Sequence, residues 1–121
     1  MDCLFCDLER DLIIENDFAV AVYDSYPVSD GHALVIPKRH ATTIFDLSED
    51  EYTGCFELVK RLKSVLQKKH STSAFNIGAN CGEVAGQTIQ HAHIHVIPRY
   101  EGDVDDPRGG VRHVIPSKAH Y

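Results

Sequence analysis

The sequence lacks any apolar run close to the roughly 20 residues that a membrane-spanning helix requires. It also lacks a basic excess, because 12 Lys and Arg stand against 18 Asp and Glu, which gives a formal net charge of −6. An acidic chain is a poor general binder of nucleic-acid backbone, although one local basic pocket can still hold a phosphate. We therefore expect no membrane protein and no partner of nucleic-acid polymers.

The first eleven residues lack the basic and apolar regions of a secretory signal, and four of them are acidic. We therefore expect a cytoplasmic protein. In that compartment the four cysteines are thiols or metal ligands rather than a disulfide framework.

No internal repeat or linker divides the first hundred residues. A length of 121 residues, with 43% hydrophobic and 25% charged residues, is typical of one ordinary globular domain. The composition changes after residue 100, where acidic residues, Pro107 and two glycines follow one another. We predict a single domain over residues 1–121, with a core over 1–100 and an irregular C-terminal arm over 101–121.

Short apolar runs bounded by turn residues predict strands at residues 12–15, 18–24, 31–37, 73–79 and 90–97, the last one ended by Pro98. Ser48 and Glu51 fit a capping box, and apolar residues follow at helical spacing as far as Lys68, Lys69 and His70. Three strands, one helix and two strands, without βαβ alternation, predict an α+β fold. We expect a five-stranded antiparallel sheet with the long helix on one face.

The last strand alternates histidine with apolar residues, in the order His91, Ala92, His93, Ile94, His95 and Val96. Because side chains alternate between the two faces of a strand, the imidazoles are expected on one surface and the apolar groups in the core. Three interpretations are open at this point. The row is a solvated polar face, a set of metal ligands, or a catalytic row with a separate task for each imidazole.

In the catalytic interpretation the middle residue, His93, is best placed to attack a phosphorus, because it has an imidazole on each side. A nucleophilic imidazole must be unprotonated at the attacking nitrogen while an acceptor holds its other nitrogen. A protonated neighbour such as His95 would stabilise the charge that develops on the phosphate. The preceding loop, with Gly82, Gly86 and Gln87, offers close backbone approach and polar donors, which suits a phosphate.

The segment 86–98, GQTIQHAHIHVIP, resembles the signature of the histidine-triad (HIT) family of nucleotide hydrolases and transferases. The segments CLFC, FAVAVYD, GHALVIPKRH and NCGEVAGQ occur upstream in the order typical of that family, so the resemblance covers about residues 1–100. It implies a five-stranded antiparallel sheet with a long and a short helix, usually in a homodimer. No organic cofactor is implied.

The resemblance also implies a role for each site residue. His93 would be the nucleophile that takes a nucleoside monophosphate, His91 would support it, and His95 would contact the phosphate. Gln87 and Thr88 would lie beside the bridging or leaving atom, and Asn80 would lie beside the α-phosphate or the nucleophile. Asp24 would contact the ribose. His32 would support the triad from the neighbouring strand.

Family substrates include dinucleoside polyphosphates such as diadenosine tetraphosphate, nucleoside phosphoramidates and other nucleotide conjugates. The chain has no tryptophan, which the phosphoramidase branch usually carries near its end, and 97–99 (IPR) is more similar to the dinucleoside-polyphosphate hydrolases. We expect an adenine nucleotide as substrate and keep the phosphoramidase as an alternative. A nucleotide-binding module without turnover, and a metal-dependent hydrolase with its ion on the triad, are two further alternatives.

Cys3 and Cys6 form a single metal-type knuckle, whereas zinc needs four ligands. Some members of the resembled family bind zinc with such a pair, the histidine after Pro-Lys-x and the first triad histidine. Carried over, the ligands are Cys3, Cys6, His40 and His91, and a closed set of four makes the ion structural. The alternative is a pair of ordinary thiols near the chain end.

The arm carries three further polar groups, Arg108, Arg112 and His113. They either reach an extended phosphate chain, in the same subunit or in a partner, or belong to a solvated arm.

Overall fold

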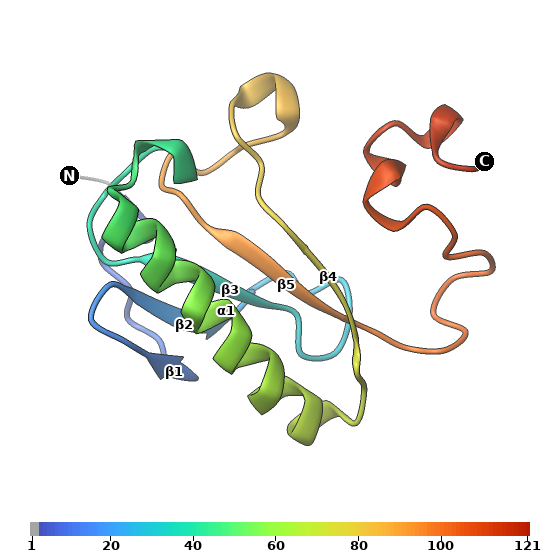
Figure 1. Ribbon diagram of the computed structural model, residues 1–121, viewed down its shortest axis with the longest axis horizontal. Coiled ribbons are helices and arrows are strands. Elements are labelled where there is room, and N and C mark those ends of the chain that lie inside the picture. The colour runs from blue at the N-terminus through green and yellow to red at the C-terminus, as the bar shows by residue number, and fades with distance from the viewer. Residues whose placement is uncertain (1–2) are drawn as a thin grey trace.

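The computed structural model describes residues 3–121, and within that range it forms one antiparallel five-stranded sheet (Figure 1). The spatial order of the strands is β1 (Ile14–Glu15), β2 (Ala19–Tyr23), β3 (Ala33–Pro37), β5 (Ile94–Arg99) and β4 (Ala74–Gly78). Helix α1 (Glu49–His70) connects β3 to β4. The predicted α+β class, with three strands before the helix and two after it, is confirmed.

The predicted start of α1 is also confirmed. The Ser48 hydroxyl accepts a hydrogen bond from the Glu51 N–H, and the Glu51 carboxylate accepts one from the Ser48 N–H. The helix ends where Ser71 turns into the left-handed region at φ 54°. The other helices within residues 3–121 are short 3₁₀ segments, namely η1 (Ile44–Asp46), η2 (Glu83–Ala85), η3 (Gly110–Val114) and η4 (Pro116–Lys118).

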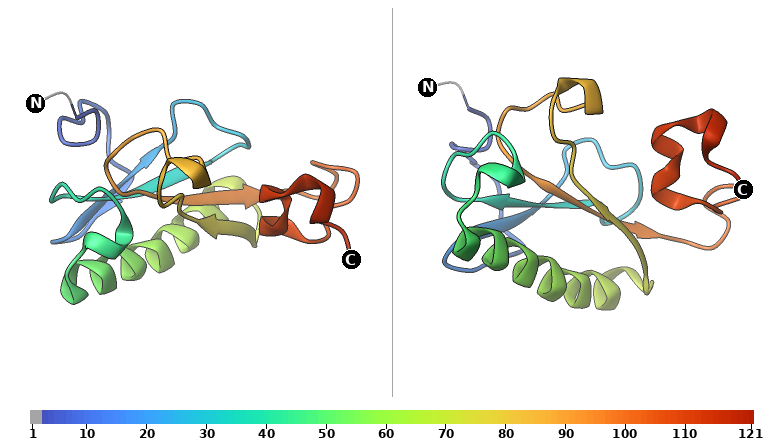
Figure 2. Two further views of the ribbon diagram at one scale, coloured as in Figure 1. Left: turned by 90° about the horizontal axis from the view of Figure 1, so that it is seen from above. Right: turned by 45° about the horizontal axis from the view of Figure 1, so that its top comes forward.

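Helix α1 covers one face of the sheet, and the N-terminal segment lies against the other face (Figure 2). Strand residues alternate between the two faces, so the sheet separates two apolar clusters. The cluster under the helix includes Ala21, Val35, Ile94, Leu58, Leu62 and Leu66. The cluster on the opposite face consists of Phe5, Val22, Leu34 and Ile36, with Cys3, Leu8, Val20 and Ile89 packed against it.

The β1–β2 hairpin is docked onto the helix at Gly54. A Cβ atom at this position would overlap the ring of Phe18, so the absence of a side chain lets the ring lie against the helix. The Asn16 amide donates to the Gly54 carbonyl at 2.8 Å, and its oxygen accepts from the backbone of Phe18 and Ala19. The predicted turn between the first two strands is therefore present.

The first and last strands differ most from the prediction. The first strand is limited to Ile14–Glu15, and the last one runs through Pro98 to Arg99. The Pro98 carbonyl accepts from the Ser29 hydroxyl, on the side of the strand away from β4. Carbonyl and nitrogen of one strand residue point to the same side, so the proline interrupts no bond to β4. Proline is tolerated in a strand where its nitrogen needs no partner.

The arm after β5 is mostly irregular, as predicted, apart from η3 and η4, which lie beyond β4 in Figure 1. Ala119 near its end is fully buried, so the arm makes its own small packed contact. Within residues 3–121, no helix combines the length and the apolar character that crossing a bilayer would require.

Candidate functional site

The triad segment lies across the start of β5 instead of forming one continuous strand. Strand β5 begins at Ile94, so His91 and His93 precede it. Ala92 is buried, but its N–H donates to the Ala41 carbonyl at 2.7 Å rather than to the sheet. The three imidazoles still lie on one face, as expected, because Phe5 contacts the rings of both His91 and His93, the His93 ring centroid lies 5.2 Å from that of His95, and the intervening apolar residues belong to the core. The rings differ in exposure. His91 is 0% exposed, because the N-terminal segment and His40 pack against it, whereas His93 and His95 are partly exposed.

The ring of His93 has the orientation that a nucleophile needs. Its Nδ1–H donates to the His91 carbonyl at 2.8 Å, so its Nε2 carries a free lone pair when the ring is neutral. The ring lies between Phe5, whose centroid is 5.1 Å away, and His95, whose centroid is 5.2 Å away. Of the three triad rings, this one has its attacking nitrogen available while its other nitrogen is held.

A chain of hydrogen bonds assigns the tautomer of His95. The Val28 N–H donates to Nδ1 of His32 at 3.1 Å, so a neutral His32 carries its proton on Nε2. The Nε2–H of His32 donates to Nδ1 of His95 at 3.0 Å. The Asp24 carboxylate lies 3.4 Å from the same His32 Nε2. The remaining proton of a neutral His95 is therefore on Nε2. This N–H is a donor for a phosphate oxygen.

The pKa of His95 is lowered to about 4, mainly by burial and in part by the neighbouring His93 and His32, against the opposing effect of Asp24. Burial also lowers the pKa of His32, against the opposing effect of Asp24. Both rings are thus neutral at pH 7 in the free protein. This differs from the expectation of a protonated His95, because removal from water disfavours the charged imidazole.

The four residues expected to bind zinc are close together. The Cys3 Sγ lies 3.3 Å from the His91 Nδ1, and the Cys6 Sγ lies 3.2 Å from the His40 Nδ1 and 3.5 Å from the His91 Nδ1. All four ligand atoms are within 4.8 Å of one another. In the sequence, Cys6 is 34 residues before His40 and 85 before His91, and Cys3 is 88 before His91, so only the fold brings these residues together.

These donors fit a zinc ion. With Zn–S and Zn–N bonds of about 2.3 and 2.1 Å at tetrahedral angles, sulfur and nitrogen ligands are separated by about 3.6 Å. The observed separations of 3.2–3.5 Å are close to this value. The His91 Nε2–H donates to the Pro37 carbonyl at 2.8 Å, which leaves Nδ1 as the ligand nitrogen and is the usual second contact of a metal-bound histidine.

The triad as a whole does not form a metal site. Among residues 3–121 two groups have ligand spacing, the cysteine–histidine cluster and a group of Asp24, His32 and His95, and neither includes His93. The second group is a poor metal site, because the Val28 N–H donates to His32 Nδ1 and Nε2 must then keep its proton. The geometry thus gives no support to an ion held by the three triad rings.

The Gln87 side chain organises the loops beside the site. It is 4% exposed, its oxygen accepts from the Gly82 N–H at 2.8 Å, and its amide donates to the carbonyls of Thr42 at 2.7 Å and Ile89 at 3.0 Å. All three contacts are to backbone groups. Gln87 therefore connects the 82–87 loop to the segment after β3, which the sequence did not indicate.

Replacing Gln87 with alanine should lower the free energy of unfolding by about 2 kcal/mol, because buried backbone groups would lose their hydrogen-bond partners. Urea denaturation measures the change. Gln90→Ala is the matched control, since Gln90 is exposed and should change stability by less than about 0.5 kcal/mol. Equal stability of the two variants would contradict the organising role.

The other predicted substrate contacts are divided between two clefts. Asn80 lines a cleft of about 500 Å³ together with His32 and His95. Thr88 lines a different one of about 440 Å³, which it shares with Cys3 and His40. The structure thus brings Asn80 to the His95 side of the site and Thr88 to the side of the cysteine cluster.

The three polar groups of the arm are engaged within the arm itself. The Arg112 guanidinium donates to the Lys118 carbonyl at 2.8 Å and lies over the Tyr121 ring at 4.8 Å. Arg108 pairs with Asp106 at 3.6 Å, and His113 donates to the Arg108 carbonyl at 3.1 Å. In this structure none of these interactions is directed at the triad.

Phe5 is a site residue that the sequence analysis missed. It lies between the two cysteines, is buried, and places its ring edge-on against both His91 and His93. The sequence shows that an aromatic residue lies between the two cysteines, but it does not show that the histidine rings pack against it. Phe5 connects the cysteine cluster to the candidate nucleophile.

Comparison with known proteins identifies the family to which the chain belongs. The family model described as the HIT domain matches residues 7–102 of the chain. The chain belongs to the HIT family. The resemblance inferred from the triad segment is thereby confirmed, and so is the family fold.

Two curated relatives of this HIT protein have named activities. An asymmetrical bis(5′-nucleosyl)-tetraphosphatase of Schizosaccharomyces pombe is 42% identical over 80 residues, which cover 66% of this chain and 44% of the relative. An adenylylsulfatase of Arabidopsis thaliana is 35% identical over 107 residues, which cover 84% of this chain and 54% of the relative. The matched part is therefore about half the length of each enzyme.

A solved structure similar to this HIT protein is a zinc-bound histidine triad family protein from Mycobacterium smegmatis. It has 32% sequence identity and a TM-score of 0.76, and the match covers 84% of this chain and 78% of that one. Membership of the HIT family supports a nucleotide hydrolase or transferase activity at the level of the family. The cysteine–histidine cluster and this relative support a possible zinc site.

Proposed function

We propose that this protein cleaves a nucleotide conjugate at the α-phosphate through a covalent intermediate on His93. The observation that carries the proposal is the hydrogen bond from His93 Nδ1–H to the His91 carbonyl, which leaves Nε2 as a nucleophile. The neutral His95, with its donor on Nε2, supplies a hydrogen bond to the phosphate next to it. Both features match what nucleophilic attack on phosphorus requires.

The reaction proceeds in two displacements. The lone pair of His93 Nε2 forms a bond to the α-phosphorus, the bond from phosphorus to the leaving atom breaks, and the leaving atom keeps the electron pair and takes a proton from solvent. Water then attacks the phosphorus, the N–P bond breaks with its electron pair returning to Nε2, and the water releases a proton. The net change is hydrolysis to a nucleoside monophosphate and the protonated leaving group; another acceptor in place of water gives transfer.

The surrounding residues complete the proposed site. Asp24 contacts the ribose and supports His32, whose Nε2 lies 3.4 Å from the carboxylate. Asn80 contacts the phosphate from the His95 side, and Thr88 contacts the bridging or leaving atom. Gln87 keeps the loop before Thr88 in place through its three backbone contacts, so its contribution to the reaction is positional.

We propose a structural zinc ion on Cys3, Cys6, His40 and His91. Four protein ligands leave no position for substrate, so the ion cross-links the N-terminal segment to the end of β3 and to the triad segment. His91 then serves twice, since its ring binds the ion while its carbonyl holds the ring of His93.

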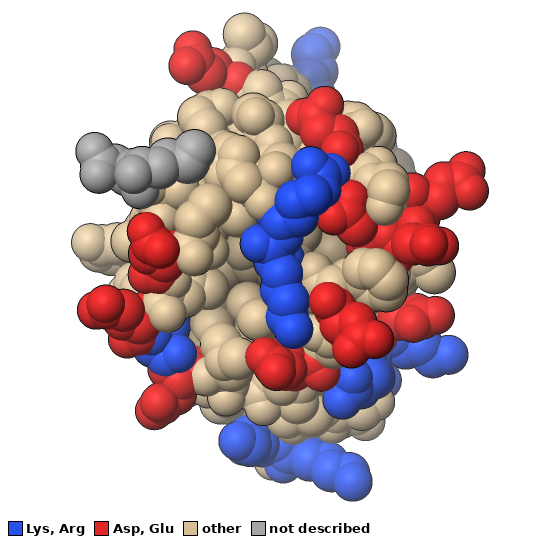
Figure 3. Space-filling model, turned by 90° about the vertical axis from the view of Figure 1, so that its left-hand side faces the viewer, with Lys and Arg blue, Asp and Glu red and all other residues tan. Residues whose placement is uncertain are grey.

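The substrate proposed first is an adenine dinucleoside polyphosphate such as diadenosine tetraphosphate, which the named activity of the fission-yeast relative supports. A nucleoside phosphoramidate is the alternative in the same site. A homodimer is expected as well. No broad basic surface appears on the face shown in Figure 3, where acidic groups flank a short basic row, in keeping with a small nucleotide as partner.

Covalent trapping tests the proposal. The protein is mixed briefly with diadenosine tetraphosphate or with adenosine 5′-phosphoramidate, quenched without acid, digested and analysed by mass spectrometry. We expect an adenylyl group on the peptide that contains His93. Tight binding of adenosine monophosphate without an adduct or product would instead support a binding module, and activity that needs added metal after chelation would support a metal-dependent hydrolase.

A further inference from the structure

We propose that Cys6 and Cys3 react with hydroperoxides, so that Cys6 is oxidised first, Cys3 then forms a disulfide with it, and the bound zinc is released. This inference rests on the structural zinc ion of the proposed function and is independent of the chemistry at the α-phosphate. Its result is a looser attachment of the N-terminal segment that covers His91.

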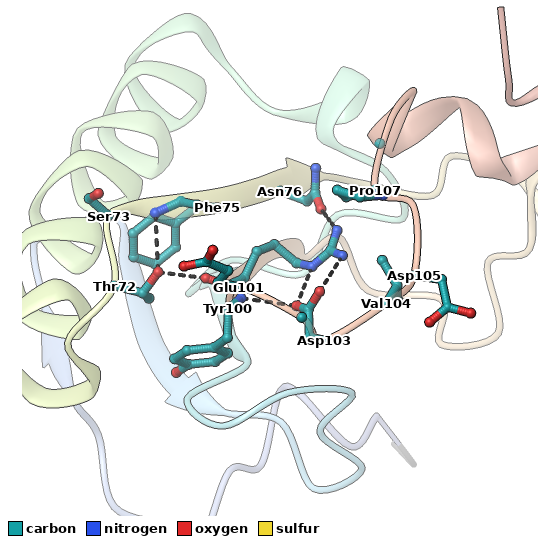
Figure 4. Close-up of a pocket in the computed structure, with 14 residues that line it drawn as sticks. Thr72, Ser73, Phe75, Asn76, Tyr100, Glu101, Asp103, Val104, Asp105 and Pro107 are labelled. Atoms are coloured by element: carbon teal, nitrogen blue, oxygen red, sulfur yellow. Dashed lines mark hydrogen bonds and ion pairs between the residues drawn. The ribbon is translucent and has the colours of Figure 1, made fainter.

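The cysteine pair is a set of nucleophilic side chains that the proposed reaction at the phosphate does not use. Zinc deprotonates the thiols that bind it, and the thiolate is the form of cysteine that hydroperoxides oxidise. By contrast, a cavity of about 650 Å³ at the start of the arm is lined by no cysteine. The charge of its Arg99 is already paired, because the guanidinium donates to both Asp103 oxygens at 2.8 and 2.9 Å and to the Asn76 amide oxygen at 2.6 Å (Figure 4).

Both sulfurs of the pair are within reach of a small oxidant. Cys6 is exposed and Cys3 is partly buried. Cys3 and His40 line a cleft of about 440 Å³, so solvent reaches the cluster from this side as well. The other two cysteines are less suited to this reaction, because burial raises the pKa of Cys55 to about 11 and Cys81 lies outside the cluster. We therefore assign the first oxidation to Cys6.

The backbone turn at residues 3–6 brings the two sulfurs close enough for a disulfide. The Cys6 N–H donates to the Cys3 carbonyl at 3.2 Å, and a turn of this kind keeps its end Cα atoms within about 7 Å. A disulfide requires a Cα separation of about 4.4–6.8 Å. The two Sγ atoms lie within 4.8 Å of each other, so rotation of the side chains can join them.

The oxidation takes place in two steps. The Cys6 thiolate attacks one oxygen of hydrogen peroxide, an S–O bond forms, the O–O bond breaks, and the second oxygen leaves as hydroxide with the electron pair. The Cys3 thiolate then attacks the Cys6 sulfur, the S–S bond forms, and the S–O bond breaks with loss of a second hydroxide. The two thiolates lose two electrons in total, the peroxide gains them, and the charges of the two hydroxides balance that of the released Zn²⁺.

The disulfide replaces a link between distant segments by a link within one turn. Its sulfurs carry no thiolate charge, so His40 and His91 would remain as the only protein ligands, too few for a structural zinc ion. The disulfide closes only residues 3–6, and the stabilisation from a cross-link decreases with the length of the closed loop. The His91 carbonyl still holds the ring of His93, so the attacking nitrogen keeps its orientation.

Treatment of the zinc-loaded protein with a small excess of hydrogen peroxide tests the inference. A chromophoric chelator follows the release of zinc, and we expect about one ion per chain. The tryptic peptide 1–10, which contains both cysteines, should become lighter by two hydrogen atoms and resist alkylation until it is reduced. The thermal midpoint should fall to within about 3 °C of that of the chelated protein, and dithiothreitol with added zinc should restore it.

Cys81→Ser is the matched control, because it removes a partly buried thiol outside the cluster. Its rate of zinc release should stay within about twofold of the wild-type rate. Zinc that stays bound while Cys81 is oxidised, release that disappears in Cys81→Ser, or release with sulfinic acid and no disulfide overturns the inference. A reduced wild-type protein without zinc overturns the zinc site together with it, whereas the adenylyl group on the His93 peptide tests the proposed reaction separately.

Discussion

His93→Ala should lower kcat for release of the nucleoside monophosphate by roughly 10⁴-fold or more, the scale of losing a covalent nucleophile. The change removes the one nitrogen that the structure leaves free for attack, Nε2, while the His91 carbonyl that holds the ring stays in place. Substrate affinity should change far less, because the ribose and phosphate contacts come from other residues. Steady-state kinetics with diadenosine tetraphosphate and with adenosine 5′-phosphoramidate measure kcat, and equilibrium binding of adenosine monophosphate measures affinity.

His120→Ala is the control for this prediction. His120 is an exposed histidine of the arm, and its Nε2 lies 3.6 Å from Asp106, so its loss should leave kcat within about twofold. Near-normal turnover of His93→Ala would show that the middle histidine is not the nucleophile. An adduct that survives in His93→Ala would assign the attack to another residue.

Loss of the zinc ligands should cost the protein a large part of its stability. Cys3→Ser, like chelation of the wild-type protein, should lower the thermal midpoint by about 10 °C, which corresponds to about 3 kcal/mol for a chain of this size. The ion would connect three segments that are distant in sequence, and without it the N-terminal segment loses this connection and depends on weaker contacts such as the packing of Phe5 and its neighbours. Zinc content measured by atomic emission, with thermal unfolding followed by circular dichroism, tests both parts.

Cys81→Ser provides the comparison, because Cys81 is a partly buried free thiol outside the cysteine–histidine cluster. It should keep its zinc and its thermal midpoint within about 2 °C. A wild-type protein that binds no zinc, or a Cys3→Ser variant with the midpoint of the wild type, would show that the cysteines are ordinary thiols. Chelated protein that remains folded should also remain active, since no step of the proposed reaction passes through the ion.

Local signals in the sequence predicted the fold well. The capping box at Ser48 and the apolar spacing behind it located α1, because a helix start and one buried stripe depend on residues within a few turns of one another. The turn around Asn16 was predicted for the same reason. The continuation of β5 through Pro98 was not, since whether a strand tolerates proline depends on which side of it is paired.

The candidate site was predictable in its residue types and less so in its geometry. Alternation indicated that Ala92 and Ile94 are buried, and they are. It also placed His91 on the same face as His93, and Phe5 contacts both rings. It did not indicate that His91 is buried, because the N-terminal segment that covers it is more than eighty residues earlier. The role of Gln87 as a link between loops also depends on a distant carbonyl, that of Thr42.

The sequence by itself determined the secondary structure, the HIT family membership and the set of side chains from which the site is built, since these follow from local spacing and from one specific motif. Only the tertiary structure decided which histidine nitrogen is free, which ring is neutral and which thiol of the cysteine pair is exposed. The physical reason is that proton positions, pKa values and ligand clusters are set by atoms a few ångströms away in space, whatever their separation along the chain.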